Sequence, residues 1–212
     1  MGADRITQGP SITGTNAYDS QALVLDVTNN ILETSGTNRT MQAARTALIV
    51  LGAQTALSTV TTAQNLISKT LNAGVLNKAL RTLLIQGSVI YTSPGTTTPT
   101  ITIAVTLGGV SLCSITTAAV SSTASTNMPV QFEFQLQTAT TGSSGTIESH
   151  GYVYANISAN TPAAASGIYC DTNTAVSSSV NLASALALAV TVAASSTITS
   201  VQLRQASVEC VF

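Results

Sequence analysis

One short segment gathers most of the side chains in this sequence whose types and spacing could do chemistry. Glu148, His150, Tyr152 and Tyr154 stand at every second position, and His150 is the single histidine of the chain. Residues at this spacing share one face of a β-strand. We expect Glu133, from the preceding strand-like segment, to lie beside them. Aromatic rings stack on the apolar faces of sugars while carboxylates and amides take the hydroxyls, so any ligand site should include this row. The simpler interpretation is an ordinary exposed or interfacial sheet face.

Catalytic interpretations of the same residues are weak. Ser149 and His150 are adjacent on a strand and must point to opposite faces, and the chain has no G-x-S-x-G elbow. Glu133 and Glu148 would form a glycosidase pair only if their carboxyl groups were about 5–9 Å apart, and we expect both to be solvated surface acids. No P-loop, dinucleotide fingerprint or EF-hand spacing is present. The sequence predicts no enzyme and no catalytic residue.

The three cysteines suggest no metal or redox chemistry. Cys113, Cys170 and Cys210 are widely spaced and form neither a CxxC nor a Cys/His pattern, so no zinc site or full disulfide framework is predicted. We expect buried free thiols, and neither a cofactor nor a metal.

The composition predicts a subunit of an assembly. Only 7% of the residues are charged, and the formal net charge is −1, against roughly 25% charged residues in a typical soluble domain. The mean hydropathy is +0.37. A charge-poor surface of near-zero net charge favours association. We therefore expect a homo-oligomer, either a trimer or a larger lattice.

Charge and hydropathy patterning also argue against two classes of partner. Six of the seven basic residues lie in the first 81 positions, and residues 82–203 contain no Lys or Arg. Nucleic-acid binding needs clustered basic residues, so we expect none by the C-terminal part. The apolar runs at 43–57 and 182–194 fall short of the about 20 apolar residues that a membrane span needs. The first residues match neither a secretory signal nor a myristoylation motif, so we expect synthesis in a cytoplasm.

Residues 1–62 differ from the rest of the chain. Two short apolar runs around Asn29-Asn30 predict a small hairpin. A two-stranded hairpin is not stable alone, so it must pack on the main domain or on a neighbouring subunit. Residues 41–54 carry mixed helix and strand signals and stay unassigned.

Residues 63–212 alternate strand-length segments with turn residues. Ile103, Val105 and Leu107 alternate with polar or small residues before Gly108-Gly109, a pattern that predicts a hairpin. Further segments show the same alternation. In the segment before Gln137, the inward set is Phe132, Phe134 and Leu136, and the outward set is Gln131, Glu133 and Gln135.

The segment 186–194 and the C-terminal strand carry two further predictions. Ala187, Ala189 and Ala193 form a small apolar outward stripe, which predicts an interface. The inward set changes parity near Gln205-Ala206, which predicts a β-bulge. About eight strands separated by regular turn signals predict an all-β fold, an antiparallel β-sandwich or barrel.

A family resemblance is carried by several segments of residues 63–212. These are TLNAGVL at 70–76, RTL at 81–83, PTITIAVTLGGV at 99–110, GTIESHG at 145–151 and NLASALAL at 181–188. Together they resemble the jelly-roll-type domain of tailed-bacteriophage virion proteins, which serve as head fibres, capsid decoration proteins or tail appendages. These motifs are structural and include no catalytic signature. The resemblance implies a virion part, assembled in the host cytoplasm, whose partners are capsid or tail subunits.

The resulting hypothesis is a non-enzymatic virion structural protein. Residues 1–62 would attach it to the particle and residues 63–212 would be displayed as a β-sandwich. The alternative is a tail receptor-binding protein that recognises a host surface glycan through Tyr152 and Tyr154. A glycan-degrading tail enzyme is a third interpretation, and location on head or tail stays open.

Overall fold

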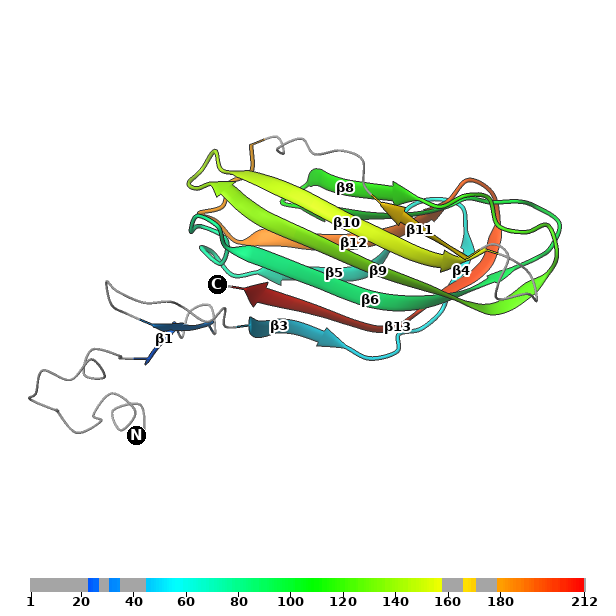
Figure 1. Ribbon diagram of the computed structural model, residues 1–212, viewed down its shortest axis with the longest axis horizontal. Coiled ribbons are helices and arrows are strands. Elements are labelled where there is room, and N and C mark those ends of the chain that lie inside the picture. Colours follow the sequence, from blue (N-terminus) through cyan, green and yellow to red (C-terminus); the bar gives the residue numbers. More distant parts are fainter. Residues whose placement is uncertain (1–22, 27–30, 35–44, 158–165, 171–178, 212) are drawn as a thin grey trace, which may run out of the picture.

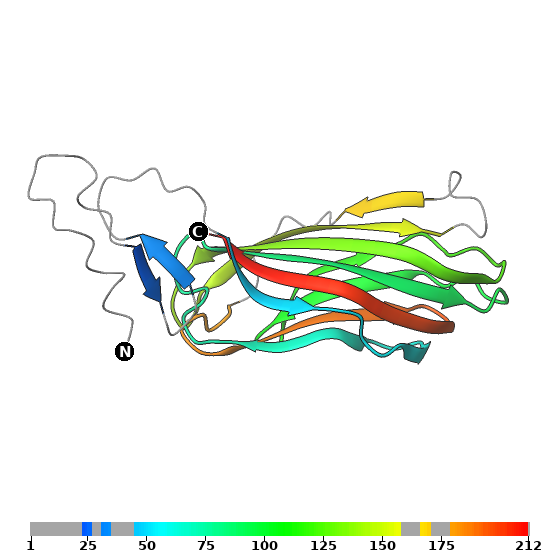
Figure 2. The ribbon, with the colours of Figure 1, turned by 90° about the horizontal axis from the view of Figure 1, so that it is seen from below.

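The computed structural model describes residues 23–26, 31–34, 45–157, 166–170 and 179–211, and these residues form strands and no helix. All strand pairings between them are antiparallel. Two main sheets lie against each other, with β5 and β12 behind the larger sheet in Figure 1 and the layers separated in Figure 2. The predicted all-β antiparallel sandwich is confirmed.

The larger sheet has seven strands in the order β11-β10-β9-β6-β13-β3, with β4 also paired to β13. Their bounds are β3 Arg45–Leu51, β4 Leu57–Val60, β6 Thr82–Ser93, β9 Ser125–Thr140, β10 Thr146–Asn156, β11 Ser166–Cys170 and β13 Ile198–Val211. The smaller sheet has the order β5-β12-β7-β8. Its strands are β5 Gln64–Leu71, β7 Ile101–Leu107, β8 Val110–Thr116 and β12 Leu186–Ala194.

Period-two burial builds the core between these sheets. Along β9, Phe132, Phe134 and Leu136 are buried while the residues between them are exposed or half-buried, as predicted from the alternation. The inward side chains of β7 and β12 meet them from the smaller sheet and alternate in the same way. Removing this apolar area from water is the main stabilising contribution. Each outward face is thereby left for solvent or a partner.

Two hydroxyl groups donate to backbone carbonyl oxygens inside the core, one between the two layers and one within the larger sheet. The buried Ser149 hydroxyl donates to the carbonyl oxygen of Leu112 at 2.6 Å, which joins β10 to β8. The Tyr91 hydroxyl of β6 donates to the Asn156 carbonyl oxygen at 2.7 Å. Both hydroxyls are satisfied, so burying them avoids the cost of an unpaired donor.

The predicted hairpin and bulge are both present. Gly108 and Gly109 have φ angles of 58° and 83°, the positive values that a type I′ turn requires at both central positions, and they connect β7 to β8. In β13 the register against β6 shifts between Leu203 and Gln205. Arg204 and Gln205 are consequently both exposed, and two successive polar side chains reach the outer face of the larger sheet.

Strands before residue 63 also belong to the sandwich. The stretch left unassigned contains β3, which pairs with β13, and β4 pairs with the other end of β13. The larger sheet therefore begins upstream of the boundary predicted at residue 62. The predicted hairpin is present as β1 Leu23–Asp26 and β2 Ile31–Thr34, a separate two-stranded sheet. Residues 1–22, 27–30 and 35–44 lie outside the described residues, and the attachment role of residues 1–62 stays a prediction.

The cysteines differ from the sequence-based expectation at one position. Cys113 and Cys210 are buried, whereas Cys170 is exposed. Cys170 lies on the edge strand β11 opposite Tyr152, so its side chain lies on the outer face of the sheet and not in the core.

Among the described residues, no group of three or more His, Cys, Asp or Glu side chains is arranged to hold a metal ion. The same residues include no helix long and apolar enough to cross a membrane.

Candidate functional site: the outer face of the seven-stranded sheet

The row predicted from the sequence lies along the outer face of β10. His150, Tyr152 and Tyr154 are exposed, whereas Ser149 and Val153, at alternate positions, are buried. Tyr152 and Tyr154 retain 40% and 37% of their accessible surface, which leaves part of each ring open to a ligand. The alternation places Glu148 on the same face, half-buried.

Strand register decides which of these residues meet. Tyr152 stands opposite Glu133, His150 opposite Gln135, and Glu148 opposite Gln137. Glu133 and Glu148 are thus offset by four positions, about 13 Å along the strands at ~3.3 Å per residue. A glycosidase pair needs carboxyl groups within about 5–9.5 Å. The structure therefore does not bring these two carboxylates together as such a pair.

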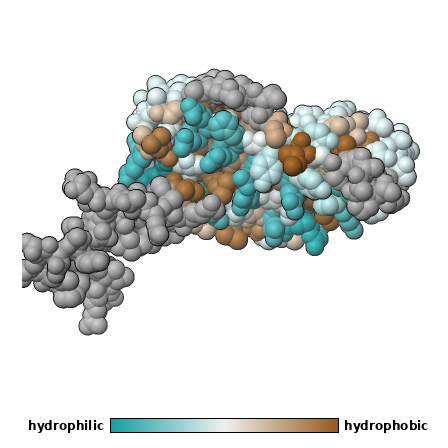
Figure 3. All heavy atoms as spheres, in the orientation of Figure 1, coloured by the Kyte–Doolittle hydropathy of each residue, from teal (hydrophilic) through white to brown (hydrophobic). Residues whose placement is uncertain are grey.

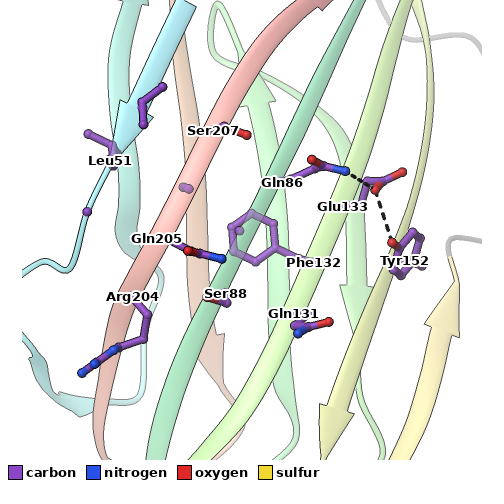
Figure 4. Close-up of a pocket in the computed structure, with 14 residues that line it drawn as sticks. Leu51, Gln86, Ser88, Gln131, Phe132, Glu133, Tyr152, Arg204, Gln205 and Ser207 are labelled. Atoms are coloured by element: carbon purple, nitrogen blue, oxygen red, sulfur yellow. Dashed lines mark hydrogen bonds between the residues drawn. The ribbon is translucent and has the colours of Figure 1, made fainter. Parts of the chain in front are cut away.

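Glu133 is the centre of a small hydrogen-bond network (Figure 4). The Gln86 amide Nε2 donates to Glu133 Oε2 at 2.6 Å, and the Tyr152 hydroxyl donates to the same oxygen at 3.2 Å. Partial burial, the negative charge of Glu133 and this hydrogen bond all raise the pKa of Tyr152 above its ordinary value. Tyr152 consequently stays protonated as a donor to Glu133 well above neutral pH.

A groove of about 650 Å³ crosses the sheet beside this network. Its lining comes from five strands or their ends, β3, β13, β6, β9 and β10, and Figure 4 shows the polar side chains along it. The groove follows a row of residues that stand directly opposite one another on neighbouring strands. The row runs through Val50, Ser207, Gln86, Glu133 and Tyr152.

A second row adds further polar groups to the groove. Gln205, Ser88 and Gln131 stand opposite one another on β13, β6 and β9 and all three line the groove. Arg204 lies at its rim, where Figure 4 shows the guanidinium directed away from Glu133. The bulge in β13 is what brings both Arg204 and Gln205 to this surface.

The floor of the groove depends on the close packing of a phenylalanine ring against a glycine. Gly87 on β6 stands opposite Phe132 on β9. A Cβ added at Gly87 would lie 2.3 Å from Cζ of Phe132, so the ring occupies the space that any other residue would need. Gly87 and Phe132 both line the groove.

Sequence reasoning found Glu133 and Tyr152 but missed the other side of the groove. Gln86, Ser88, Ser207, Arg204 and Gln205 come from strands far apart in the sequence, and only sheet order makes them neighbours. The parity change predicted at Gln205 was the available signal, because a bulge turns an extra side chain outward. His150 and Glu148, by contrast, do not line the groove.

The outer face as a whole is mainly polar. In Figure 3, which views this sheet from outside, teal and pale atoms cover most of the described surface and brown atoms form small groups. The exposed large apolar side chains here are Val50 at one edge and Ile168, opposite Tyr154, at the other. Val50 lines the groove at its β3 end, whereas Ile168 is not part of the lining.

The predicted interface stripe lies on the opposite side of the molecule. Ala187 is exposed and Ala189 and Ala193 are half-buried on the outer face of β12. Their cross-strand neighbours are small as well, since Ser68 and Thr106 flank Ala189. Strands β7, β8 and β12 contain no charged residue. This surface therefore has few groups that would resist desolvation.

Comparisons with known proteins do not place the chain in a family. No protein-family model and no curated protein matches it. Among solved structures, the CBM2 module of the evolved Dit protein of Lactobacillus casei BL23 phage J-1 is similar over 67% of this chain and 67% of that chain. The sequence identity is 11% and the TM-score is 0.30.

Proposed function

We propose that this chain is a non-enzymatic structural subunit of a bacteriophage virion that displays its β-sandwich from the particle. The observation that carries the proposal is the outer face of the smaller sheet, where Ala189 and its neighbours are small and the three strands β7, β8 and β12 have no charge. The charged residue of this sheet is Lys69, exposed on the edge strand β5. Burying the part of this face formed by β7, β8 and β12 between subunits desolvates no charge. The resemblance of residues 63–212 to virion jelly-roll domains agrees with this role.

In this proposal the protein acts by multivalent contact. Its partners are further copies of itself and capsid or tail subunits, and residues 1–62 form the attachment segment. A subunit repeated on a particle gains strength from many weak contacts.

Labelling of intact particles tests the virion proposal directly. An affinity tag placed after residue 212 should be detected by gold-conjugated reagent at regular positions on the particle, and the position distinguishes head from tail. Purified infectious particles that contain none of the protein would contradict the proposal.

The absence of enzymatic activity is part of the proposal and has its own test. Incubating the purified protein with host polysaccharide should release no smaller products. Product release that disappears in Glu148→Gln would identify a glycan-degrading enzyme instead.

Host-glycan recognition from the phage tail is a second candidate function. It is favoured by the exposed rings of Tyr152 and Tyr154 beside a polar groove. Here Tyr152→Ala and Tyr154→Ala should each weaken attachment to host cells while the oligomeric state stays the same. If the wild-type protein shows no attachment to host cells, this candidate fails and the structural role is unaffected.

A further inference from the structure

We infer that the groove between Tyr152 and Gln205 is a binding site for an uncharged pyranose sugar, with Glu133 as its central acceptor. The inference deepens the glycan-recognition candidate and rests on it for its biological role. The proposed site lies in the middle of the sheet, whereas the row predicted from the sequence follows the single strand β10.

The groove offers hydrogen-bonding groups that the protein itself leaves unused. Among the described residues, the side chains of Ser88, Gln131, Gln205 and Ser207 form no hydrogen bond with one another or with another residue, and Glu133 Oε1 accepts none. Hydroxyls and primary amides both donate and accept. Closely spaced hydroxyls of a sugar need this mixture, because each one is itself a donor and an acceptor.

Glu133 is held ready for such a ligand. Its Oε2 accepts from Gln86 at 2.6 Å and from Tyr152 at 3.2 Å, so the carboxylate is oriented before anything binds. The second oxygen, Oε1, is then available to accept from a ligand hydroxyl. A group that is already oriented loses less side-chain entropy on binding, which favours affinity.

The same network prepares a stacking surface. Because the hydroxyl of Tyr152 is bonded to Glu133, the ring is tied at one end beside the groove while 40% of the residue stays accessible. The apolar face of a pyranose ring can pack on an aromatic ring whose polar end is already satisfied.

Charge and volume favour a neutral sugar over other ligand classes. The lining carries one carboxylate, Glu133, and one guanidinium, Arg204, and Figure 4 shows the two directed apart. A nucleic acid would need several clustered cations. A mainly apolar ligand would need a lining dominated by apolar side chains. The volume of about 650 Å³ lies within the roughly 300–1,000 Å³ usual for small-molecule sites.

The test uses the full chain and defined sugars as probes. Methyl pyranosides of glucose, galactose, mannose and N-acetylglucosamine are titrated by saturation-transfer difference NMR, with galacturonic acid as the charged comparison. We expect at least one neutral pyranoside to bind, and galacturonic acid to bind more weakly than methyl galactoside because Glu133 repels its carboxylate. Failure of all four neutral probes, or preference for galacturonic acid, would overturn the inference.

Three variants locate the site. Glu133→Gln should weaken binding about 10-fold or more, because a neutral amide oxygen accepts a weaker hydrogen bond than a carboxylate does. Ser88→Trp should abolish binding by filling the groove, and it removes no hydrogen bond to a described residue. Gln135→Ala is the matched control, since Gln135 is exposed on the same face of β9 but outside the groove. Equal affinity in all three variants would place the sugar elsewhere and contradict the inference.

The outcomes separate this inference from the proposed function. Oligomeric state and incorporation into particles are measured on the same variants and should equal those of the wild type. Normal incorporation without sugar binding rejects the groove but keeps the structural role. Sugar binding by a protein that is absent from particles keeps the groove as a sugar site but rejects the structural role in the virion.

Discussion

Glu133 uses a single oxygen to hold Gln86 and Tyr152, and the titration of Tyr152 reports on that arrangement. Burial and the charge of Glu133 raise the pKa of the phenol, because both disfavour the phenolate. Glu133→Gln removes the charge and should shift the Tyr152 pKa down, towards its ordinary value. Carbon-13 NMR of labelled tyrosine, assigned with Tyr152→Phe, measures the shift. An unchanged pKa in Glu133→Gln would show that the two side chains do not interact in solution.

Tyr91 makes a second prediction at the residue scale, about alkaline stability. Burial, together with the charge of Tyr169 when that phenol ionises, raises the pKa of Tyr91 from 10.0 to about 12. A group whose pKa is raised by folding contributes stability that is complete below its unfolded pKa and is lost as pH rises through the folded value. The contribution of Tyr91 is therefore full below about pH 10 and is lost between about pH 10 and 12.

The variant Tyr91→Phe isolates this contribution. Near neutral pH it should lose about 0.5–1.5 kcal/mol of unfolding free energy, because the hydrogen bond to the Asn156 carbonyl oxygen disappears. Between pH 10 and 12 the variant should lose stability less steeply than the wild type. Urea unfolding across this range measures both effects, and parallel pH profiles would contradict the assignment.

At the scale of strands, the packing of Phe132 over Gly87 joins β9 to β6 under the groove. Gly87→Ala places a methyl group where the ring lies and should destabilise the fold by about 1–3 kcal/mol, the usual cost of overpacking. Gly52→Ala is the matched control, since a Cβ there meets no atom within 4 Å. Urea midpoints compare the two variants. Equal midpoints would mean that the ring moves aside at little cost.

Two strands upstream of residue 63 give a prediction about truncation. Because β3 and β4 pair with β13, deleting residues 1–44 should leave the β-sheet circular-dichroism signal and the unfolding midpoint nearly unchanged. Deleting residues 1–62 removes both pairings and should lower the midpoint. Equal stability of the two truncated chains would show that β3 and β4 contribute little to the sheet, and would support a boundary at residue 62.

At the scale of the whole molecule, the two outer faces differ in chemistry. The larger sheet presents a groove with amides, hydroxyls, one carboxylate and one guanidinium. The smaller sheet presents Ala, Ser and Thr without charges on β7, β8 and β12. We expect the second face to associate with other subunits and the first to stay accessible.

Assembly through the smaller sheet is tested by one charge. Ala189→Glu places a carboxylate in the middle of that face and should weaken a homo-oligomer, because the charge would have to be desolvated in the interface. Light scattering at micromolar concentration measures the mass, with Gln135→Glu on the opposite face as control. A monomeric wild-type protein, or an oligomer equally weakened by both changes, would contradict the assignment of the interface.

The local alternation of apolar and polar residues was sufficient to predict the strands and the buried side of each strand. Phe132, Phe134 and Leu136 alternate with polar residues, and Gly108-Gly109 supplies the positive φ angles of a tight turn. These properties depend on neighbours in the sequence, so the sequence by itself determined the all-β class, the hairpin and the outward row on β10. The bulge near Gln205 followed from a change of parity in the same way.

Only the tertiary structure decided which strands are neighbours. Sheet order places β6 between β9 and β13, and this order brings Gln86, Glu133 and Gln205 to one groove from segments far apart in the chain. Register then sets Tyr152 opposite Glu133 and moves Glu148 four positions away. Strand order and register follow from the packing of the whole core and not from the period of any one strand, which is why the row was visible in the sequence and the groove was not.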